Sequence, residues 1–133
     1  MKFIDILFEN NEITFQKKCE ITIINDFGES VIIDCEVPST EEEKSTGLMY
    51  RDNLCDNCGL FYDYVDSGFW MKNVKFPIEM IFVNGSEIVD IVIAHANDET
   101  IIHPSKPSDG NIEVNKGFCE NNDISVGNTF YIS

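Results

Sequence analysis

Residues 77–94, PIEMIFVNGSEIVDIVIA, decide how this chain folds. Two runs rich in Ile, Val, Met and Phe, 77–83 and 87–94, flank the dipeptide Asn84-Gly85. Asn-Gly between such runs is the strongest short-range signal for a β-hairpin, because both residues tolerate the positive φ angles of a tight turn. The segment therefore predicts two antiparallel strands joined by a two-residue turn.

Turn residues separate further strand-like runs along the chain. The runs 20–24 and 31–37 flank a turn that contains Gly28, which predicts a second hairpin. The runs 3–8 and 12–15, around a turn at Asn10-Asn11, predict another pair of strands before it. Residues 60–65, 111–114 and 128–133 also have β character, and the two prolines of 95–110 indicate a surface loop.

One segment has helical signals. In residues 38–50, PSTEEEKSTGLMY, Ser39 or Thr40 can cap a helix start, and Glu42 or Glu43 can close a capping box three residues later. The glutamates of the first turn also suit the helix dipole. The expected fold class is therefore α+β, predominantly antiparallel β: a compact curled sheet or small β-barrel-like domain with one short helix near residues 40–49.

Length and charge restrict the function. The 133 residues, 43% of them hydrophobic, predict a single domain, 1–133, with one core. The formal net charge of −15 argues against direct binding to nucleic acid or anionic membranes. The chain has no run of about 18 apolar residues, which predicts no membrane span.

The N-terminal sequence and the cysteines predict a cytoplasmic protein. Acidic residues interrupt the apolar residues of MKFIDILFENNEITF, unlike the apolar centre of a secretory signal. The five cysteines are an odd number, and together with the absence of an export signal this favours reduced thiols. They are Cys19, Cys35, Cys55, Cys58 and Cys119.

Several segments, read in order, form one pattern: Gly47–Arg51 (GLMYR), Gly59–Phe61 (GLF), Phe69–Val74 (FWMKNV), 77–85 with its PIEM strand and Asn84-Gly85, 112–114 with Gly117, and 126–128. This pattern resembles that of the uncharacterised family DUF192. The resemblance covers residues 31–132 and leaves 1–30 as additional N-terminal strands. It implies a compact β-rich domain without an established activity, and many relatives look exported. At Leu60, Val74, Glu79 and Asn128 the family usually has Met, Thr, Asp and Asp.

Arg51 is the only arginine of the chain. Its guanidinium group can pair bidentately with a carboxylate or a phosphate. One interpretation is an internal ion pair with Glu79, Glu36 or Glu43 that fastens the helix to the sheet. The other is a clamp for an anionic ligand.

Trp70, Lys72 and Asn73 follow one another on an expected strand or its bend. Alternation along a strand places Trp70 and Lys72 on one face and Phe69, Met71 and Asn73 on the other. A structural interpretation packs the aromatic residues in the core and lets Asn73 hydrogen-bond to a turn. A functional interpretation is a groove with an aromatic wall, a cation at Lys72 and a hydrogen-bonding amide at Asn73.

Glu79 interrupts the apolar run of 76–83. Shielding from water would raise its pKa, whereas a nearby Arg51 or Lys72 would lower it. An ion pair with one of these cations is the favoured expectation. A catalytic acid at Glu79 is the alternative.

Cys55 and Cys58 form a CxxC motif that lies outside the DUF192 pattern. Such a pair can be half of a zinc site, a redox dithiol or two unrelated thiols. Zinc is a weak candidate here because no second CxxC and no closely spaced histidine pair supplies the other ligands. No cofactor is predicted.

Three hypotheses about function follow. The first is a non-enzymatic binding or accessory protein whose groove is bordered by Arg51 and residues 70–73, with a small anionic or polar molecule or a protein segment as ligand. The second is an enzyme that uses Glu79 with Lys72 or Arg51. The third is an acidic interaction protein that occupies a basic partner. The candidate ligand-binding residues are Arg51, Trp70, Lys72, Asn73 and Glu79, and no catalytic residue is assigned.

Overall fold

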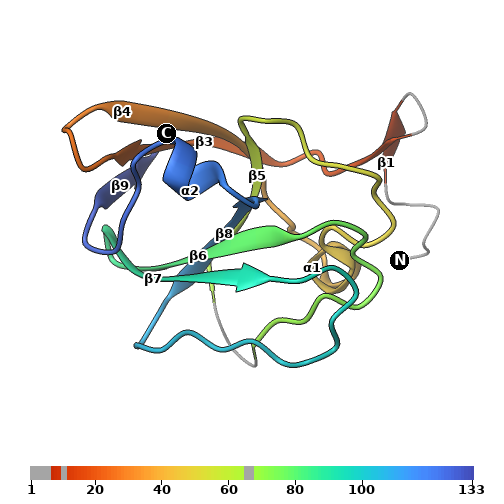
Figure 1. Ribbon diagram of the computed structural model, residues 1–133. Coiled ribbons are helices and arrows are strands. Elements are labelled where there is room, and N and C mark those ends of the chain that lie inside the picture. The colour runs from red at the N-terminus through yellow and green to blue at the C-terminus, as the bar shows by residue number, and fades with distance from the viewer. Residues whose placement is uncertain (1–6, 10–11, 65–67) are drawn as a thin grey trace.

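The computed structural model describes residues 7–9, 12–64 and 68–133. Seven strands form one sheet that closes on itself in the order β3-β4-β5-β8-β6-β7-β9 (Figure 1). They are β3 (Lys18–Ile24), β4 (Ser30–Glu36), β5 (Cys58–Tyr62), β6 (Ile78–Asn84), β7 (Glu87–Ala94), β8 (Gly110–Asn115) and β9 (Thr129–Ile132). Strands β1 (Leu7–Glu9) and β2 (Glu12–Thr14) form a separate pair at one end of the molecule. The α+β class, dominated by antiparallel pairing, is confirmed.

The hairpin predicted around Asn84-Gly85 is present as β6 and β7. Asn84 itself pairs with Glu87, so the two loop residues are Gly85 and Ser86, one position later than expected. Gly85 has a φ of 64°, which its missing side chain permits. A bulge follows, because Val83 pairs with Ile88 while Phe82 pairs with Asp90.

The hairpin predicted around Gly28 is β3 and β4, which pair in antiparallel register from Ile24 opposite Ser30 to Lys18 opposite Glu36. The turn expected at Asn10-Asn11 lies outside the described residues. Strand β5 runs parallel to β4, which requires a crossover connection. That crossover carries the helix α1 (Glu41–Thr46) and brings it against the outer face of the sheet.

The inner face of the closed sheet holds the first hydrophobic core. Every strand of the ring contributes at least one buried residue to it. Examples are Ile21, Ile33, Phe61, Ile112, Ile81, Ile88 and Phe130, in strand order around the ring.

A second hydrophobic core lies on the outer face of β5 and β6. There Leu60, Tyr62, Met80 and Phe82 are buried by residues from four other segments. The covering residues are Ile13, Phe15, Leu48, Leu54, Met71, Val74 and Ala94. Because both faces of β6 are covered, its burial is continuous from Ile78 to Val83.

Helix α1 begins as the sequence predicts. Thr40 caps it, accepting a hydrogen bond from the Glu43 amide at 3.1 Å while the Glu43 carboxylate accepts the Thr40 amide. The helix ends at Thr46 and is shorter than the expected span of 40–49. Gly47 stops it with a φ of 50°, at a place where a β-carbon would lie 2.7 Å from the Tyr62 hydroxyl.

Two local expectations were wrong. Residues 69–74 do not form a strand; Phe69 makes one isolated bridge to Ile102, and the chain then turns. Trp70 and Lys72 are nonetheless exposed together while Met71 is buried. A second short helix, α2 (Phe118–Asn121), was not expected.

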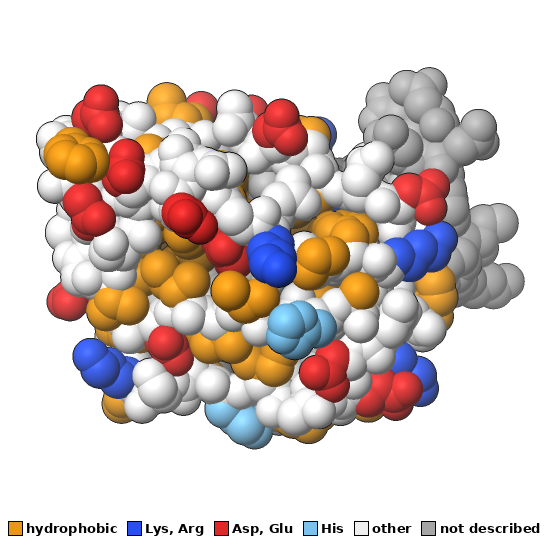
Figure 2. Space-filling view, in the orientation of Figure 1, with side chains coloured by type: hydrophobic (Ala, Val, Ile, Leu, Met, Phe, Trp, Pro, Cys, Tyr) orange, Lys and Arg blue, Asp and Glu red, His pale blue; other side chains and the backbone are white. Residues whose placement is uncertain are grey.

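Figure 2 shows how the acidic residues are distributed on one face of the molecule. On the face shown in Figure 2, Asp and Glu side chains are scattered among apolar and neutral ones instead of forming one patch. Within the described ranges, no helix has both the length and the apolar character to cross a membrane.

Candidate functional site

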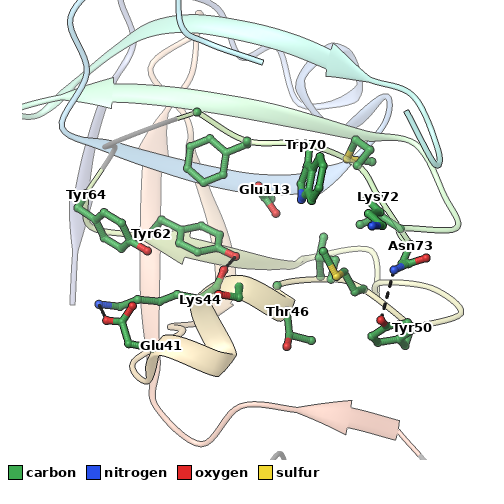
Figure 3. A pocket seen from close by; sticks show the side chains of 18 residues that line it. Glu41, Lys44, Thr46, Tyr50, Tyr62, Tyr64, Trp70, Lys72, Asn73 and Glu113 are labelled. Carbon is green, nitrogen blue, oxygen red and sulfur yellow. Dashed lines mark hydrogen bonds and ion pairs between the residues drawn. The ribbon is translucent and has the colours of Figure 1, made fainter. Parts of the chain in front are cut away.

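A pocket of about 680 Å³ opens on the outer face of the sheet, between residues 44–50 and residues 68–74. The first segment is the end of α1 and the turn after it, and the second is the FWMKNV stretch with Gly68 before it. Tyr62 and Tyr64, at and after the end of β5, form one side, and Glu113 of β8 reaches the pocket from the sheet (Figure 3).

Gly47 allows the two sides of the pocket to approach. The Tyr62 hydroxyl fits against Gly47 and donates a hydrogen bond to the Lys44 carbonyl at 3.3 Å. Any larger residue at position 47 would push Tyr62 away. Burial raises the pKa of Tyr62 well above its usual value, so this phenol stays neutral.

Tyr50 and Asn73 join the two segments at the rim. The Tyr50 amide donates to the Asn73 carbonyl at 3.0 Å, and the Asn73 side-chain amide donates to the Tyr50 hydroxyl at 3.3 Å. Both residues have left-handed backbones, with φ of 67° and 62°. Such non-glycine backbones cost of order 1 kcal/mol and cluster at functional sites.

Aromatic rings form much of the pocket wall. Tyr62 packs edge-on against Phe69 and Tyr64, with ring centroids 5.3 Å and 6.2 Å apart. Lys44 lies over Tyr64 at 4.8 Å, and Lys72 lies over the exposed ring of Trp70 at 5.3 Å. The pocket thus combines an aromatic wall with two lysines, and Lys44 also contacts Glu41 at 3.8 Å.

Glu113 is the buried acid of the pocket. Its side chain points from β8 into the space between Tyr62 and Trp70, although the residue is only 5% exposed (Figure 3). Its carboxyl group lines the pocket and accepts no hydrogen bond from any described residue. Burial raises the pKa of Glu113 to about 8, and the charge of Arg51 opposes this only in part.

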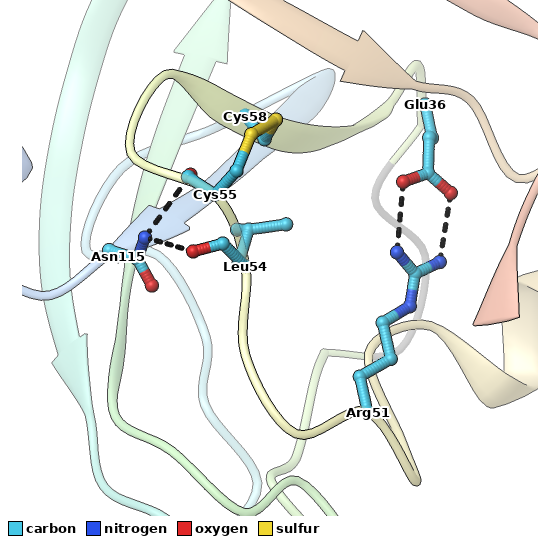
Figure 4. Close-up of a disulfide and its surroundings, with 6 residues drawn as sticks. All are labelled: Glu36, Arg51, Leu54, Cys55, Cys58 and Asn115. Atoms are coloured by element: carbon cyan, nitrogen blue, oxygen red, sulfur yellow. Dashed lines mark hydrogen bonds and ion pairs between the residues drawn. A yellow bond between two sulfur atoms is a disulfide. The ribbon is translucent and has the colours of Figure 1, made fainter. Parts of the chain in front are cut away.

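Arg51 lies behind the pocket and does not line it. Its guanidinium group binds Glu36 through two hydrogen bonds of 2.9 Å (Figure 4). It also lies over the ring of Phe15 at 4.9 Å. The internal ion pair expected for Arg51 is confirmed, with Glu36 as the partner.

Glu79 is also placed away from the pocket, and the expected ion pair with Arg51 or Lys72 was wrong. Its carboxylate accepts the backbone amides of Gly117 and Cys119 at 2.8 and 2.9 Å. These amides belong to the start of α2, so Glu79 holds that helix inside the sheet. The reason is its face: alternate residues of β6 point to opposite cores, and Glu79 shares the inner face with Ile81.

Cys55 and Cys58 form a disulfide with α-carbons 5.1 Å apart, so this pair is not reduced as the sequence suggested (Figure 4). The Asn115 side chain fixes the same loop through the carbonyls of Leu54 and Cys55. Cys19, Cys35 and Cys119 are free thiols. No group of three or more His, Cys, Asp or Glu residues in the described part of the chain is arranged to hold a metal ion.

Comparison with known families gives a clear result. The model of DUF192, described as Uncharacterized ACR, matches residues 22–132. This chain belongs to the DUF192 family. The match begins nine residues before the residue 31 inferred from the motifs, so it includes the last three residues of β3.

Two solved structures resemble this DUF192 protein over most of its length. One is a proposed transcription regulator from Sinorhizobium meliloti 1021, with a TM-score of 0.81, 25% identity and coverage of 91% of this chain and 97% of that one. The other is a protein of unknown function from Novosphingobium aromaticivorans DSM 12444, with a TM-score of 0.78, 27% identity and coverage of 86% and 84%. No curated protein matches the chain.

The pocket joins two of the segments that carry the DUF192 resemblance. Residues 47–50 of the GLMYR motif and 69–74 of the FWMKNV motif both line it. Of the five candidate ligand-binding residues, the structure brings Trp70, Lys72 and Asn73 together there and places Arg51 and Glu79 elsewhere.

Glu113 and Tyr62 were missed from the DUF192 sequence. Glu113 lies in the run NIEV, where a polar residue at an alternate strand position usually faces solvent. The neighbouring Asn111 shares its face and is completely buried without a partner for its amide. The available signal was that Asn111 and Glu113 share one face of the strand. The sequence does not show that another segment of the chain covers this face.

Proposed function

We propose that this protein binds a small polar molecule in the pocket between residues 44–50 and 68–74, as a non-enzymatic binding or accessory protein. The observation that supports this most directly is the buried Glu113, whose carboxyl group accepts no hydrogen bond from a described residue and faces a pocket with several aromatic rings in its wall. Small-molecule sites have this character: apolar walls with a few polar groups that set orientation.

The rim supplies groups that suit an anionic or polar part of the ligand. Lys72 is exposed over Trp70 and makes no ion pair with a described residue. Asn73 is held by Tyr50 in a left-handed backbone, which fixes the position of its amide. The strained pair at the rim supports a functional role, since such backbones persist where the surrounding structure imposes them.

The experiment is a screen of small carboxylates, amines and neutral polar compounds by thermal shift and by amide NMR. A ligand should stabilise the protein and move the resonances of residues 47–50 and 69–74. Trp70→Ala should abolish the response. Phe27→Ala, which removes a 74% exposed aromatic ring in the turn between β3 and β4, should leave the response unchanged. Equal loss in both variants, or shifts only outside the pocket, would refute the proposal.

A second candidate is an enzyme in which Glu113, instead of Glu79, acts as the acid. A carboxyl with a raised pKa in a pocket is a typical general acid, and this observation favours Glu113. Time-resolved NMR of a bound ligand separates the two functions. An unchanged ligand supports binding alone, and a new product that Glu113→Gln fails to form supports the enzyme.

Two other functions have less support. The description of the Sinorhizobium protein suggests regulation of transcription, but a net charge of −15 disfavours direct contact with nucleic acid. Occupation of a basic partner would benefit from a concentrated acidic patch, and the acidic side chains in Figure 2 are dispersed.

A further inference from the structure

We propose that the ligand carries a protonated amine at its buried end, held by the Glu113 carboxylate and by the surrounding aromatic rings. This inference rests on the proposed binding function and names the chemical class of its ligand. It assigns Glu113 as the residue that selects that class.

The first support is the Glu113 carboxyl group itself, which has no hydrogen-bond donor among the described residues. Glu113 is 5% exposed, and its backbone is fixed between β5 and β6, opposite Leu60 and Met80. A buried polar group without a partner costs free energy that a hydrogen-bonding ligand restores. An ammonium group can donate three hydrogen bonds and also neutralises the charge, so it fits this carboxylate better than a neutral or anionic group does.

The second support is the aromatic wall. Tyr62, Tyr64, Phe69 and Trp70 all line the same pocket as Glu113. Ring faces attract cations, and aromatic cages are a recurrent way to bind ammonium groups. The chain already shows this affinity, because Lys44 and Lys72 each lie over one of these rings.

The third support is that the chain's own cations are engaged elsewhere. Arg51 gives two hydrogen bonds to Glu36, and Lys44 contacts Glu41 and the Tyr64 ring. Lys72 lies over Trp70 at the rim. None of these three cations donates a hydrogen bond to Glu113. A cationic group of the ligand can therefore occupy the place of its counter-ion.

Lys72 adds a constraint on the other end of the ligand. A cation at the rim favours a negative or neutral group there, because a second positive group would be repelled. A dipolar molecule, with its amine inward and its anionic end near Lys72 and Asn73, satisfies both ends of the pocket.

The test uses three four-carbon probes: butylammonium, butyrate and butanol. Trp70 is the only tryptophan and lines the pocket, so its fluorescence reports occupancy directly. At constant ionic strength, butylammonium should bind at least about tenfold more tightly than the other two. Equal or tighter binding of butyrate or butanol would overturn the amine inference and leave the binding function standing.

Glu113→Gln supplies the decisive variant, because it removes the charge and keeps the shape. It should weaken butylammonium binding by about tenfold or more, whereas Glu120→Gln, the same change at an exposed position of α2 outside the pocket, should alter it by less than about twofold. Equal effects would mean attraction by the overall negative charge and would overturn the proposal. So would the absence of a saturable response to butylammonium in the wild type, whatever the wider screen finds.

The wild type alone gives an independent readout if Glu113→Gln folds poorly. The charged and titratable groups around Glu113 are Tyr62 of β5, Arg51 after α1, and the pocket residues Glu41, Lys44, Tyr50, Tyr64 and Lys72. An alkylammonium stays protonated well above neutral pH, as lysine does. Butylammonium affinity should therefore rise by up to about tenfold per pH unit until Glu113 is ionised near pH 8, and a flat profile from about pH 6 to 8 would contradict the proposal.

Discussion

Arg51 and Glu36 form a bidentate ion pair, with Nη1 to Oε2 and Nη2 to Oε1 both at 2.9 Å. Glu36 also accepts the Phe15 amide at 2.7 Å. A single carboxylate at the end of β4 therefore ties together the segment before β3 and the segment after α1. The only arginine of the chain serves the fold at this place.

Replacement of Arg51 should destabilise the protein. Arg51 is 7% exposed and the Glu36 side chain 16%, so Arg51→Ala would leave a largely buried carboxylate unpaired and lower the free energy of unfolding by about 3 kcal/mol. Arg51→Lys keeps the charge but loses the two-pronged geometry and should give an intermediate loss. Urea unfolding measures both.

The exposed pair between Lys75 and Asp52 is the control. Its atoms are also close, at 3.1 Å, but the side chains are 54% and 89% exposed. Lys75→Ala should therefore cost less than about 1 kcal/mol. If Arg51→Ala were as well tolerated as Lys75→Ala, the structural role assigned to Arg51 would be wrong.

Glu79→Gln should loosen the connection between β6 and α2. The carboxylate accepts two backbone amides, and a glutamine amide group can replace only one of these acceptors. The expected loss is about 1.5–3 kcal/mol in the free energy of unfolding. Hydrogen exchange at the Gly117 and Cys119 amides should accelerate as well.

Glu120→Gln makes the same chemical change on the exposed side of α2. Its effect should stay within about 0.5 kcal/mol. Retained stability in Glu79→Gln, together with a lost ligand response, would instead return Glu79 to the functional site.

Glu113 should make the stability of the unliganded protein depend on pH. Its pKa is about 8 in the folded protein, whereas the ordinary pKa of a glutamate side chain is 4.5. Between these values the folded protein holds a proton that the unfolded chain releases. The free energy of unfolding should therefore fall as pH rises from about 4.5 to about 8, by up to about 1.4 kcal/mol per unit, and then level off.

Glu113→Gln should remove this contribution and Glu41→Gln should keep it. Urea unfolding series at several pH values measure the slope for the three proteins. A wild-type slope that Glu113→Gln leaves unchanged would show that the titrating group lies elsewhere.

The hairpins could be predicted because their signals are local. Asn84-Gly85 and the turn around Gly28 each set the pairing of adjacent strands without help from distant residues. The capping box of Thr40 and Glu43 is equally local. The early end of α1 depends on a distant residue and could not be predicted. The chain turns at Gly47 because the Tyr62 side chain, fifteen residues later in the sequence, packs against this position.

The pocket could be predicted only in part for the same reason. Trp70, Lys72 and Asn73 are neighbours in sequence and remained neighbours in the site. Glu79 and Glu113 both lie on strands with two covered faces, and only the packing decides that one meets backbone amides and the other meets a pocket. The ion-pair partner of Arg51 could not be predicted either, because three acids were candidates. In the structure Arg51 pairs with Glu36 at the end of β4.

The left-handed backbone of Asn73 allows its structural and functional roles to be separated. With a φ of 62°, Asn73→Ala should lose about 1 kcal/mol, because alanine resists this conformation and cannot bind the Tyr50 hydroxyl. Asn73→Gly relieves the backbone and should keep the stability within about 0.5 kcal/mol while removing the same amide. Asn97, with a φ of 58° outside the pocket, gives matched Ala and Gly controls. Thermal unfolding and ligand titration measure all four variants. Of the two glycine variants, which should both keep their stability, only Asn73→Gly should bind the ligand more weakly. An unchanged affinity in Asn73→Gly would mean that Asn73 only shapes the turn.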